Sequence, residues 1–302
     1  MMPRILTIIV AGLLSAVPFT AMAQVNVFAC EPEWAALAEE IGGAKIKTFS
    51  ATHARQDPHY IRARPSLIAK VRRADLIICS GAELEVGWLP ILLQKAGPQV
   101  QPNGIGHLMA SQYVPLLGAG ANVDRSMGHV HVAGNPHIHL NPHHMVPIAA
   151  QVSDRLAKID PANAAHYQSR LQDFTQRWQQ ALAQWETRAT NLKGAQVVVH
   201  HSSLSYLIDW LQMRTVASLE PKPGIPPTTS HLESLLQQLN AAPANLMLRT
   251  PYEPDTASLW LSSKTNIPAV VLPYTIDGAA NTGDLFALYE ATLAVLLGKC
   301  RC

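Results

Sequence analysis

Histidine, a side chain that binds metal ions, is concentrated in one stretch of this chain. Residues 127–144 hold nearly half of its 13 histidines, namely His129, His131, His137, His139, His143 and His144. Imidazole is the commonest protein ligand for zinc and similar borderline metals. The prolines at positions 136 and 142 each restrict the residue before them to extended geometry. We therefore interpret 134–144 as a stiff loop that presents one imidazole, and 127–131 as a looser segment that carries others.

Three other places carry candidate ligands at the ends of apolar, strand-like runs. His59 follows one such run in a loop, His200 and His201 end a second, and Asp277 lies in a loop after a third. A tetrahedral zinc site takes about four nitrogen, oxygen or sulfur ligands. Taken singly, each of these residues could instead be a hydrogen-bonded surface side chain. Their shared placement favours one metal site, to which the loop of His137 also contributes.

Strand-like and helix-like patterns alternate through most of the chain. Short apolar runs predict strands, and apolar residues at three- and four-residue spacing predict helices. We expect strands at 25–29, 46–50, 74–79, 195–199, 216–219, 245–248 and 269–272, and helices at 31–41, 65–73, 143–159, 204–211, 232–239, 258–265 and 285–297. The segment 83–93 carries Trp88 among apolar neighbours. This alternation is typical of parallel sheets covered by helices, in which ligands bind at the carboxyl ends of strands.

A long amphipathic segment separates the two α/β halves. Asp160 and Pro161 form a helix start signal, and apolar residues then recur at helical spacing until Gly194. About thirty residues at 1.5 Å each would form a rod of roughly 45 Å. The alternative is a long core helix of one domain. We predict an α/β fold of two lobes, each a mostly parallel sheet with covering helices, joined by one long spine helix. The N-terminal metal-binding lobe would span 24–159, the linking helix 160–193 and the C-terminal metal-binding lobe 194–302.

The first 23 residues have the pattern of a secretory signal peptide. They hold the basic Arg4, a short apolar run and the small-residue cleavage site Ala21-Met22-Ala23. The apolar run is too short to span a membrane, and Pro18 interrupts it. We therefore expect export to the periplasm. The formal charge of +2 gives no electrostatic basis for nucleic-acid binding.

Four cysteines could form disulfides in an exported chain. Cys30 and Cys79 both end strand-like runs, so they are either bridged or two buried small residues. Cys300 and Cys302 lie at the extreme C-terminus, where a frayed end is the simplest interpretation. Because no cysteine directly follows the cleavage site, we do not expect lipid attachment there.

Together these motifs resemble one known family over nearly the whole mature chain. The matching segments are Asp57-Pro58-His59 with Pro65-Ser66, Asn135-Pro136-His137 with Leu140-Asn141-Pro142, His201 with Tyr206, and the proline-rich loop that runs from Glu220 to Pro227. The sequence resembles the metal-specific solute-binding proteins of ABC importers, the cluster A-I or TroA-like family, and within it the zinc-binding branch. His139 stands where that family usually has tryptophan.

The resemblance implies that His59, His137, His201 and an acidic residue near the C-terminus bind the ion. Manganese-binding relatives carry a carboxylate at the third position, whereas His201 gives a nitrogen-rich site that suits zinc better. Asp277 is the expected fourth ligand. Its segment departs from the usual acidic segment of the family, so Asp284 and a water molecule are the alternatives.

The resemblance also implies a function. The chain would capture Zn²⁺ with high affinity in a cleft between its lobes and deliver it to the membrane permease of an ABC importer. His129, His131 and His139 would form a weaker, secondary capture site beside the entrance. We expect a monomer without enzymatic activity, and a periplasmic metallochaperone is a second candidate partner.

Two other functional classes are alternatives to zinc capture for an ABC importer. Three histidines and an activated water could support a zinc-dependent hydrolase, although neither an H-E-x-x-H motif nor a nucleophile elbow occurs. The other alternative is a metallochaperone or an adhesin built on the same fold.

Overall fold

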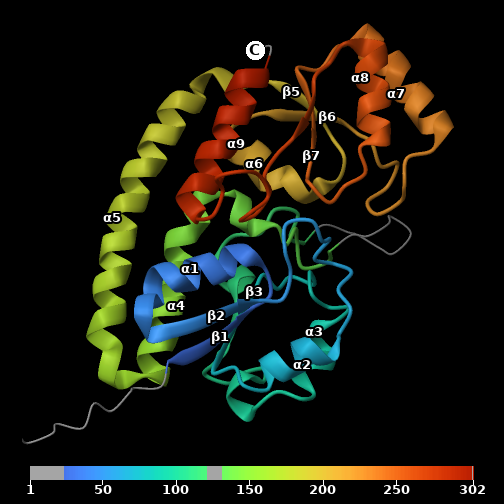
Figure 1. Ribbon diagram of the computed structural model, residues 1–302. Coiled ribbons are helices and arrows are strands. Elements are labelled where there is room, and N and C mark those ends of the chain that lie inside the picture. The colour runs from blue at the N-terminus through green and yellow to red at the C-terminus, as the bar shows by residue number, and fades with distance from the viewer. Residues whose placement is uncertain (1–23, 121–130, 301) are drawn as a thin grey trace, which may run out of the picture.

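A computed structural model describes residues 24–120, 131–300 and 302. The expected signal peptide, 1–23, and His129 lie outside the described residues. The described chain forms two α/β lobes, one below and one above in Figure 1, with a long helix along one side of both. Among the described residues, no helix combines the length and the apolar character needed to cross a membrane.

The N-terminal lobe contains a four-stranded parallel sheet in the order β2-β1-β3-β4. Its strands are β1 (Val25–Ala29), β2 (Ile46–Ser50), β3 (Leu76–Cys79) and β4 (His107–Met109), and its helices are α1 (Pro32–Gly42), α2 (Pro65–Val71) and α3 (Leu89–Leu93). All four residues of β3 are buried, as expected for a parallel strand covered on both faces. Proline at the first turn starts α1 and α2, because its missing N–H has no helical partner there in any case.

The C-terminal lobe repeats this topology with the strand order β6-β5-β7-β8. Its strands are β5 (Gln196–Val199), β6 (Arg214–Ser218), β7 (Leu246–Arg249) and β8 (Ala269–Val271), and its helices are α6 (Ser205–Trp210), α7 (Thr229–Ala241), α8 (Thr256–Thr265) and α9 (Leu285–Lys299). Polar caps fix two helix starts: the side chain of Thr228 accepts from the N–H of His231, and that of Asp284 accepts from the N–H of Ala287.

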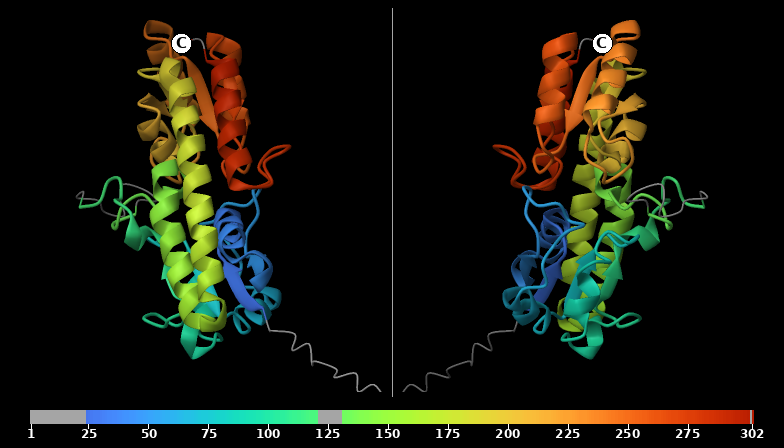
Figure 2. Two further views of the ribbon diagram at one scale, coloured as in Figure 1. Left: turned by 90° about the vertical axis from the view of Figure 1, so that its left-hand side faces the viewer. Right: turned by 90° about the vertical axis from the view of Figure 1, so that its right-hand side faces the viewer.

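Helix α5 (Ala164–Ala189) runs along both lobes, and α4 (Met145–Ile159) packs beside it in the N-terminal lobe (Figure 2). With 26 residues, α5 is about 39 Å long. The aromatic rings of Trp178 and Trp185 pack against Tyr289 of α9 at centroid distances of 5.3 and 5.2 Å. One buried apolar core therefore continues from the N-terminal sheet through α4 and α5 into the C-terminal lobe. This shared core resists a wide hinge motion between the lobes.

The sequence-based expectations differ from the structure mainly in short elements. The apolar segment 83–93 holds only the short helix α3, and Ala82 and Glu83 have left-handed backbone angles that a helix does not allow. Strand β4 was not expected, since its three residues are too few to show a periodicity. Short 3₁₀ turns at Pro161–Asn163 and Thr190–Leu192 flank α5 where one continuous helix was expected.

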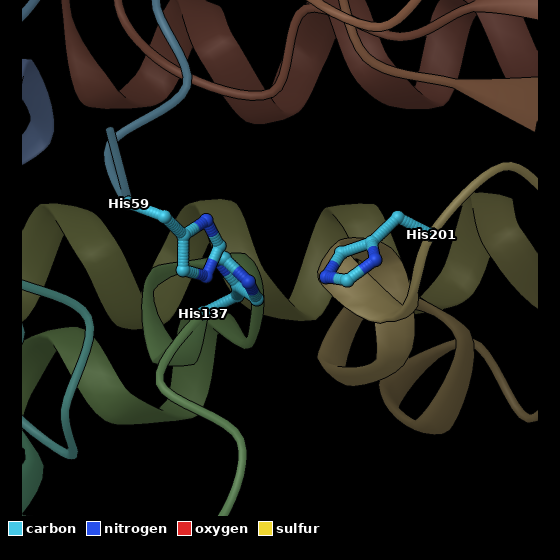
Figure 3. Close-up of side chains that lie close together, drawn as sticks. All are labelled: His59, His137 and His201. Carbon is cyan, nitrogen blue, oxygen red and sulfur yellow. The ribbon is translucent and has the colours of Figure 1, made fainter. Parts of the chain in front are cut away.

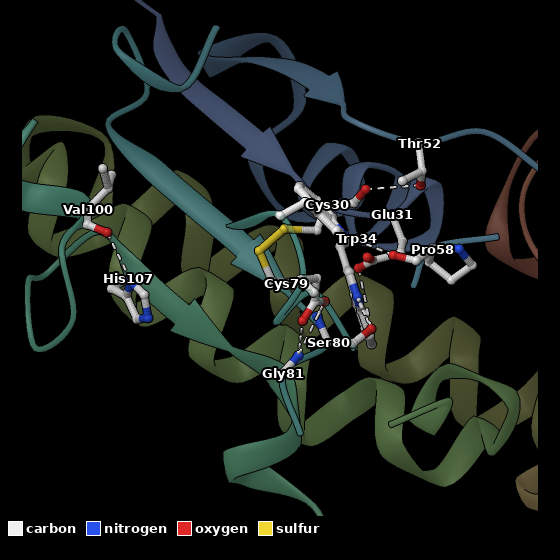
Figure 4. The surroundings of a disulfide bond; sticks show 12 residues. Cys30, Glu31, Trp34, Thr52, Pro58, Cys79, Ser80, Gly81, Val100 and His107 are labelled. Carbon is white, nitrogen blue, oxygen red and sulfur yellow. Dashed lines mark hydrogen bonds between the residues drawn. A yellow bond between two sulfur atoms is a disulfide. The ribbon is translucent and has the colours of Figure 1, made fainter. Parts of the chain in front are cut away.

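A disulfide joins Cys30 and Cys79 at the ends of the neighbouring strands β1 and β3 (Figure 4). This bond decides for the bridged interpretation of the pair, and both residues are fully buried. Cys300 and Cys302 are also joined, at the end of α9.

Candidate metal centre

Three of the histidines expected as ligands converge between the two lobes (Figure 3). One ligand atom from each of His59, His137 and His201 lies within 4.8 Å of the other two. The residues are buried, with exposed fractions of 7%, 1% and 9%. The ring of His59 lies 5.2 Å from that of His137 and 6.0 Å from that of His201, measured between centroids. Three imidazoles at this spacing can share a single metal ion.

His59 is held by a tight turn that follows β2. The carboxylate of Asp57 accepts from the backbone N–H of His59 at 3.0 Å, a local bond typical of aspartate in turns. The indole N–H of Trp88 donates to the carbonyl of Pro58 at 2.9 Å. The turn is therefore fixed to the body of the N-terminal lobe on the side of α3.

His137 lies in a loop that is bonded directly to the segment of His201. The side chain of Asn135 accepts from the N–H of His137 at 3.0 Å and donates to the carbonyl of Ser202 at 2.9 Å. The hydroxyl of Tyr206 donates to the carbonyl of Asn135 at 2.8 Å. These bonds fix His137 relative to His201, although the two residues follow different sheets.

Each of the three imidazoles has a partner at Nδ1. The Nδ1 atom of His59 lies 2.6 Å from Oδ1 of Asp57, and that of His201 lies 2.6 Å from Oε2 of Glu220. The Nδ1 atom of His137 lies 2.8 Å from the hydroxyl of Tyr274. Nε2 is therefore the nitrogen that each ring can offer to an ion, and a partner on the other nitrogen is what orients metal-binding histidines.

The Nε2 atom of His137 is buried and has no hydrogen-bond partner among the described residues. A buried nitrogen of this kind carries a free-energy cost unless something else binds it. A metal ion at the point where the three rings meet would satisfy it. The three imidazoles are also suitable donors, because neutral imidazole nitrogens suit zinc.

Burial and neighbouring charges shift the pKa values of His137 and His201 in opposite directions. Burial lowers the pKa of His137 well below its ordinary value, and the nearby His59 and His201 lower it further. Burial also acts to lower the pKa of His201, but the hydrogen bond and charge of Glu220 outweigh it, and the pKa of His201 is raised. Of these two rings, His137 therefore loses its proton more readily and His201 retains its proton more strongly.

The structure does not bring the expected acidic ligand into this group. Asp277 is exposed and has a left-handed backbone, and it is not among the grouped ligand atoms. Asp284, the alternative, caps the N-terminus of α9. The sequence could not show this, because Asp277 was chosen from its place after a strand and from the family resemblance, and neither shows how its loop turns.

The three residues expected to form a secondary capture site have different surroundings. His129 lies outside the described residues. His131 is half-buried, and its Nε2 lies 3.1 Å from Nε2 of His59. His139 does not lie at the entrance: it is 2% exposed, and its Nε2 bonds to the carbonyl of Tyr274 at 2.9 Å. The expectation that His139 is an accessible ligand is therefore corrected. His200, the alternative to His201, is buried and is not part of the convergent group.

Sequence reasoning did not identify Tyr274 or Glu33, and it gave no role to Glu220. Tyr274 is 137 positions away from the histidine that it bonds, and no pattern links residues so far apart. Glu220 had a weak signal, since it opens the proline-rich loop that resembles the family. Glu33 was part of the α1 pattern and had no separate signal.

Comparisons with known proteins agree with the fold and with a metal site. The family model described as zinc-uptake complex component A, periplasmic, matches residues 27–297. A metal ABC transporter substrate-binding lipoprotein of Streptococcus cristatus is 22% identical over 93% of this chain and 89% of its own length. A manganese ABC transporter substrate-binding lipoprotein of Streptococcus gordonii is also 22% identical, over 91% and 87%. The crystal structure of ZnuA superposes with a TM-score of 0.75 at 18% identity, over 92% of this chain and 99% of that one.

The match of the family model covers far more than half of the chain, and the structural likeness confirms the two-lobed fold. Substrate-binding subunits of ABC transporters act by binding a solute and presenting it to a membrane permease; they are not enzymes. The comparisons do not support a metallochaperone as a partner. The chain belongs to the zinc-uptake complex component A family, and it is a metal-binding, substrate-binding component of an ABC transporter.

Proposed function

We propose that this chain captures Zn²⁺ with high affinity between its two lobes and delivers the ion to the permease of an ABC importer. The observation that carries the proposal is the convergence of His59, His137 and His201, each with its Nδ1 atom bonded to a partner, so that Nε2 remains as the ligand atom. Zinc is the transported solute in this scheme. The ion would bind at the Nε2 atoms.

The donor set favours zinc over manganese. Imidazole nitrogen is a borderline ligand that suits zinc, whereas manganese favours carboxylate, carbonyl and water oxygens. The convergent group contains three imidazoles and no carboxylate. The carboxylates of Asp57 and Glu220 bond to the far nitrogens of two rings. They would balance the charge of the ion without coordinating it.

Asp277 is the candidate for the fourth coordination position. We propose His59, His137 and His201 as the main ligands, with Asp277 as a weaker contributor. The exposed position of Asp277 means that its loop would have to move for the carboxylate to reach the ion. We therefore expect the loss of Asp277 to weaken zinc binding less than the loss of any of the three imidazoles.

We further propose that the protein acts in the periplasm, after removal of the leader predicted at 1–23. Cys30, the cysteine nearest to the predicted cleavage site, is buried and bonded to Cys79. Its sulfur is therefore bonded to another cysteine of the fold and is not free to carry a lipid. Cell fractionation of the full chain tests this proposal. Recovery in the membrane fraction after removal of the permease would contradict it.

The function is tested by metal analysis of protein purified without added metal, followed by competition between zinc and manganese. We expect about one zinc per chain, retained against an excess of manganese, and we expect His59→Ala, His137→Ala and His201→Ala each to lose it. His107→Ala is the matched control, because this partly buried histidine bonds a backbone carbonyl far from the group. Retention of manganese in place of zinc, or alanine variants that bind like the wild type, would contradict the proposal.

A further inference from the structure

A chain of buried polar side chains crosses between the lobes behind the candidate site. It consists of Glu33 on α1, His139 in the loop of His137, and Tyr274 and Thr275 in the loop after β8. We call these four residues the interlobe latch. Their exposed fractions are 1%, 2%, 4% and 3%. Buried polar groups of this kind cost free energy unless they bond to one another.

Glu33 is the end of the latch in the N-terminal lobe. One of its carboxylate oxygens accepts from the hydroxyl of Thr275 in the C-terminal lobe. The other lies 3.1 Å from Nδ1 of His139, although the two atoms are not aligned as a regular hydrogen bond. Both atoms are buried and have no other hydrogen-bond partner among the described residues, so they face only each other.

His139 connects Glu33 to Tyr274. Its Nε2–H donates to the carbonyl of Tyr274 at 2.9 Å, and the two rings meet edge to face at 4.9 Å. The hydroxyl of Tyr289 on α9 donates to the carbonyl of His139. His139 is thus held by both lobes, and it supports the backbone of Tyr274 through one specific bond.

Tyr274 needs this support because its backbone is strained. Its φ angle is 61°, in the left-handed region that a bulky side chain rarely occupies. Such conformations persist only when the surroundings hold them. The turn is also tight on its other side, since a Cβ atom on Gly278 would lie 1.7 Å from the carbonyl oxygen of Pro273. In this conformation the hydroxyl of Tyr274 reaches Nδ1 of His137.

We propose that Glu33 and His139 are positioning residues for the metal site. They hold the strained turn of Tyr274, and Tyr274 in turn orients the ring of His137 so that its Nε2 faces His59 and His201. Neither Glu33 nor His139 coordinates the ion. The inference rests on the proposed function for its link to zinc, while the link from Glu33 to the ring of His137 can be tested without any metal.

The experiment compares variants that break the latch with matched variants outside it. Glu33→Leu removes the carboxylate, and the gentler Thr275→Val removes only one hydroxyl, so at least one of the two should fold. Glu33→Gln is the conservative variant, because its amide can donate to Nδ1 of His139 while its carbonyl accepts from Thr275. Glu85→Leu is the control: Glu85 is also a buried carboxylate of the N-terminal lobe, but it accepts from the N–H groups of Ser80 and Gly81.

Two readouts separate positioning from general stability. The first is the imidazole ¹⁵N spectrum of His137 in metal-free protein. We expect Glu33→Leu and Thr275→Val to change its signals, and Glu33→Gln to keep those of the wild type. The second is the rate of zinc loss to a chelator. Loss of a group that orients a metal ligand typically weakens binding on the order of 10-fold, and we expect an acceleration of that size in the two breaking variants.

Failure of the latch proposal and failure of the proposed function give different results. If Glu33→Leu and Thr275→Val leave the signals of His137 and the rate of zinc loss as in the wild type, the latch does not position the site. The same conclusion follows if Glu85→Leu changes both readouts equally, since general destabilisation would then explain them. If the wild type binds no zinc, the proposed function fails, and the ¹⁵N spectrum alone decides whether the latch orients His137.

Discussion

The Nδ1 atom of His201 lies 2.6 Å from a carboxylate oxygen of Glu220, and the same carboxylate accepts from the N–H of Gly224. Glu220 thus ties the ring of His201 to the proline-rich loop. We expect Glu220→Ala to weaken zinc binding on the order of 10-fold, because the ring loses the partner that fixes its orientation and basicity. Titration against a chelator of known affinity measures this. Glu233→Ala, an exposed carboxylate on α7, is the control, and equal effects of the two substitutions would contradict the role of Glu220.

The pH dependence of zinc binding should arise mainly from His201 near neutrality. The pKa of His201 is raised above its ordinary value of about 6.5. His201 therefore takes up a proton before the pH falls to 6.5, and zinc must displace that proton. The pKa of His137 is lowered, so His137 does not compete in this range. Affinity should therefore fall as pH drops through the raised pKa of His201.

Glu220→Gln provides the test of that assignment. Without the carboxylate the pKa of His201 should fall, and the loss of affinity should shift to lower pH. Titrations of both proteins between about pH 8 and pH 6 measure the shift. Superimposed pH profiles of the two proteins would show that His201 is not the group that competes with zinc.

The contact between His131 and His59 must break when an ion binds, because it involves the Nε2 atom that His59 offers. We expect His131→Ala to leave the final zinc affinity close to that of the wild type and to slow association when zinc is scarce, since a weak ligand beside the site raises the local concentration of the ion. Stopped-flow association and equilibrium titration separate the two effects. A loss of affinity as large as that of His59→Ala would place His131 among the ligands.

The buried carboxyl of Glu85 should make stability depend on pH. Burial raises its pKa from 4.5 to about 7. The folded state therefore keeps a proton that the unfolded state loses, so this contribution is fully present below about pH 4.5 and disappears as pH rises through about 7. Glu85→Gln cannot titrate, so the melting temperature of the wild type relative to this variant should fall from pH 5 to pH 8. A difference that grows in favour of the wild type over this range would contradict the sign.

The sequence predicted the parts of the site that have local signals. His59 and His137 each follow a proline step in a loop, and His201 ends an apolar strand, so the carboxyl-end rule for parallel sheets brought them together. The long α5 followed from its apolar periodicity. Asp277 is not among the grouped ligand atoms, and its position depends on the left-handed turns of its loop, which a single sequence does not show.

Long-range partners could not be predicted in this way. His139 was assigned to the entrance because it lies among other histidines, whereas its burial depends on Glu33 and Tyr274, which lie 106 and 135 positions away. The same holds for the bond between Tyr274 and His137. These pairs are set by how the two lobes pack against α4 and α5, and a single sequence carries no pattern for that packing.

The central claim is that one zinc ion binds between the lobes through three imidazoles. A crystal structure of the zinc-loaded protein, with anomalous data collected at the zinc absorption edge, tests it most directly. The account requires one strong peak about 2.0–2.1 Å from Nε2 of His59, His137 and His201, with Asp57, Tyr274 and Glu220 still bonded to the three Nδ1 atoms. A peak elsewhere on the chain, or an ion that is bound through Nδ1 or without one of these three imidazoles, would contradict it.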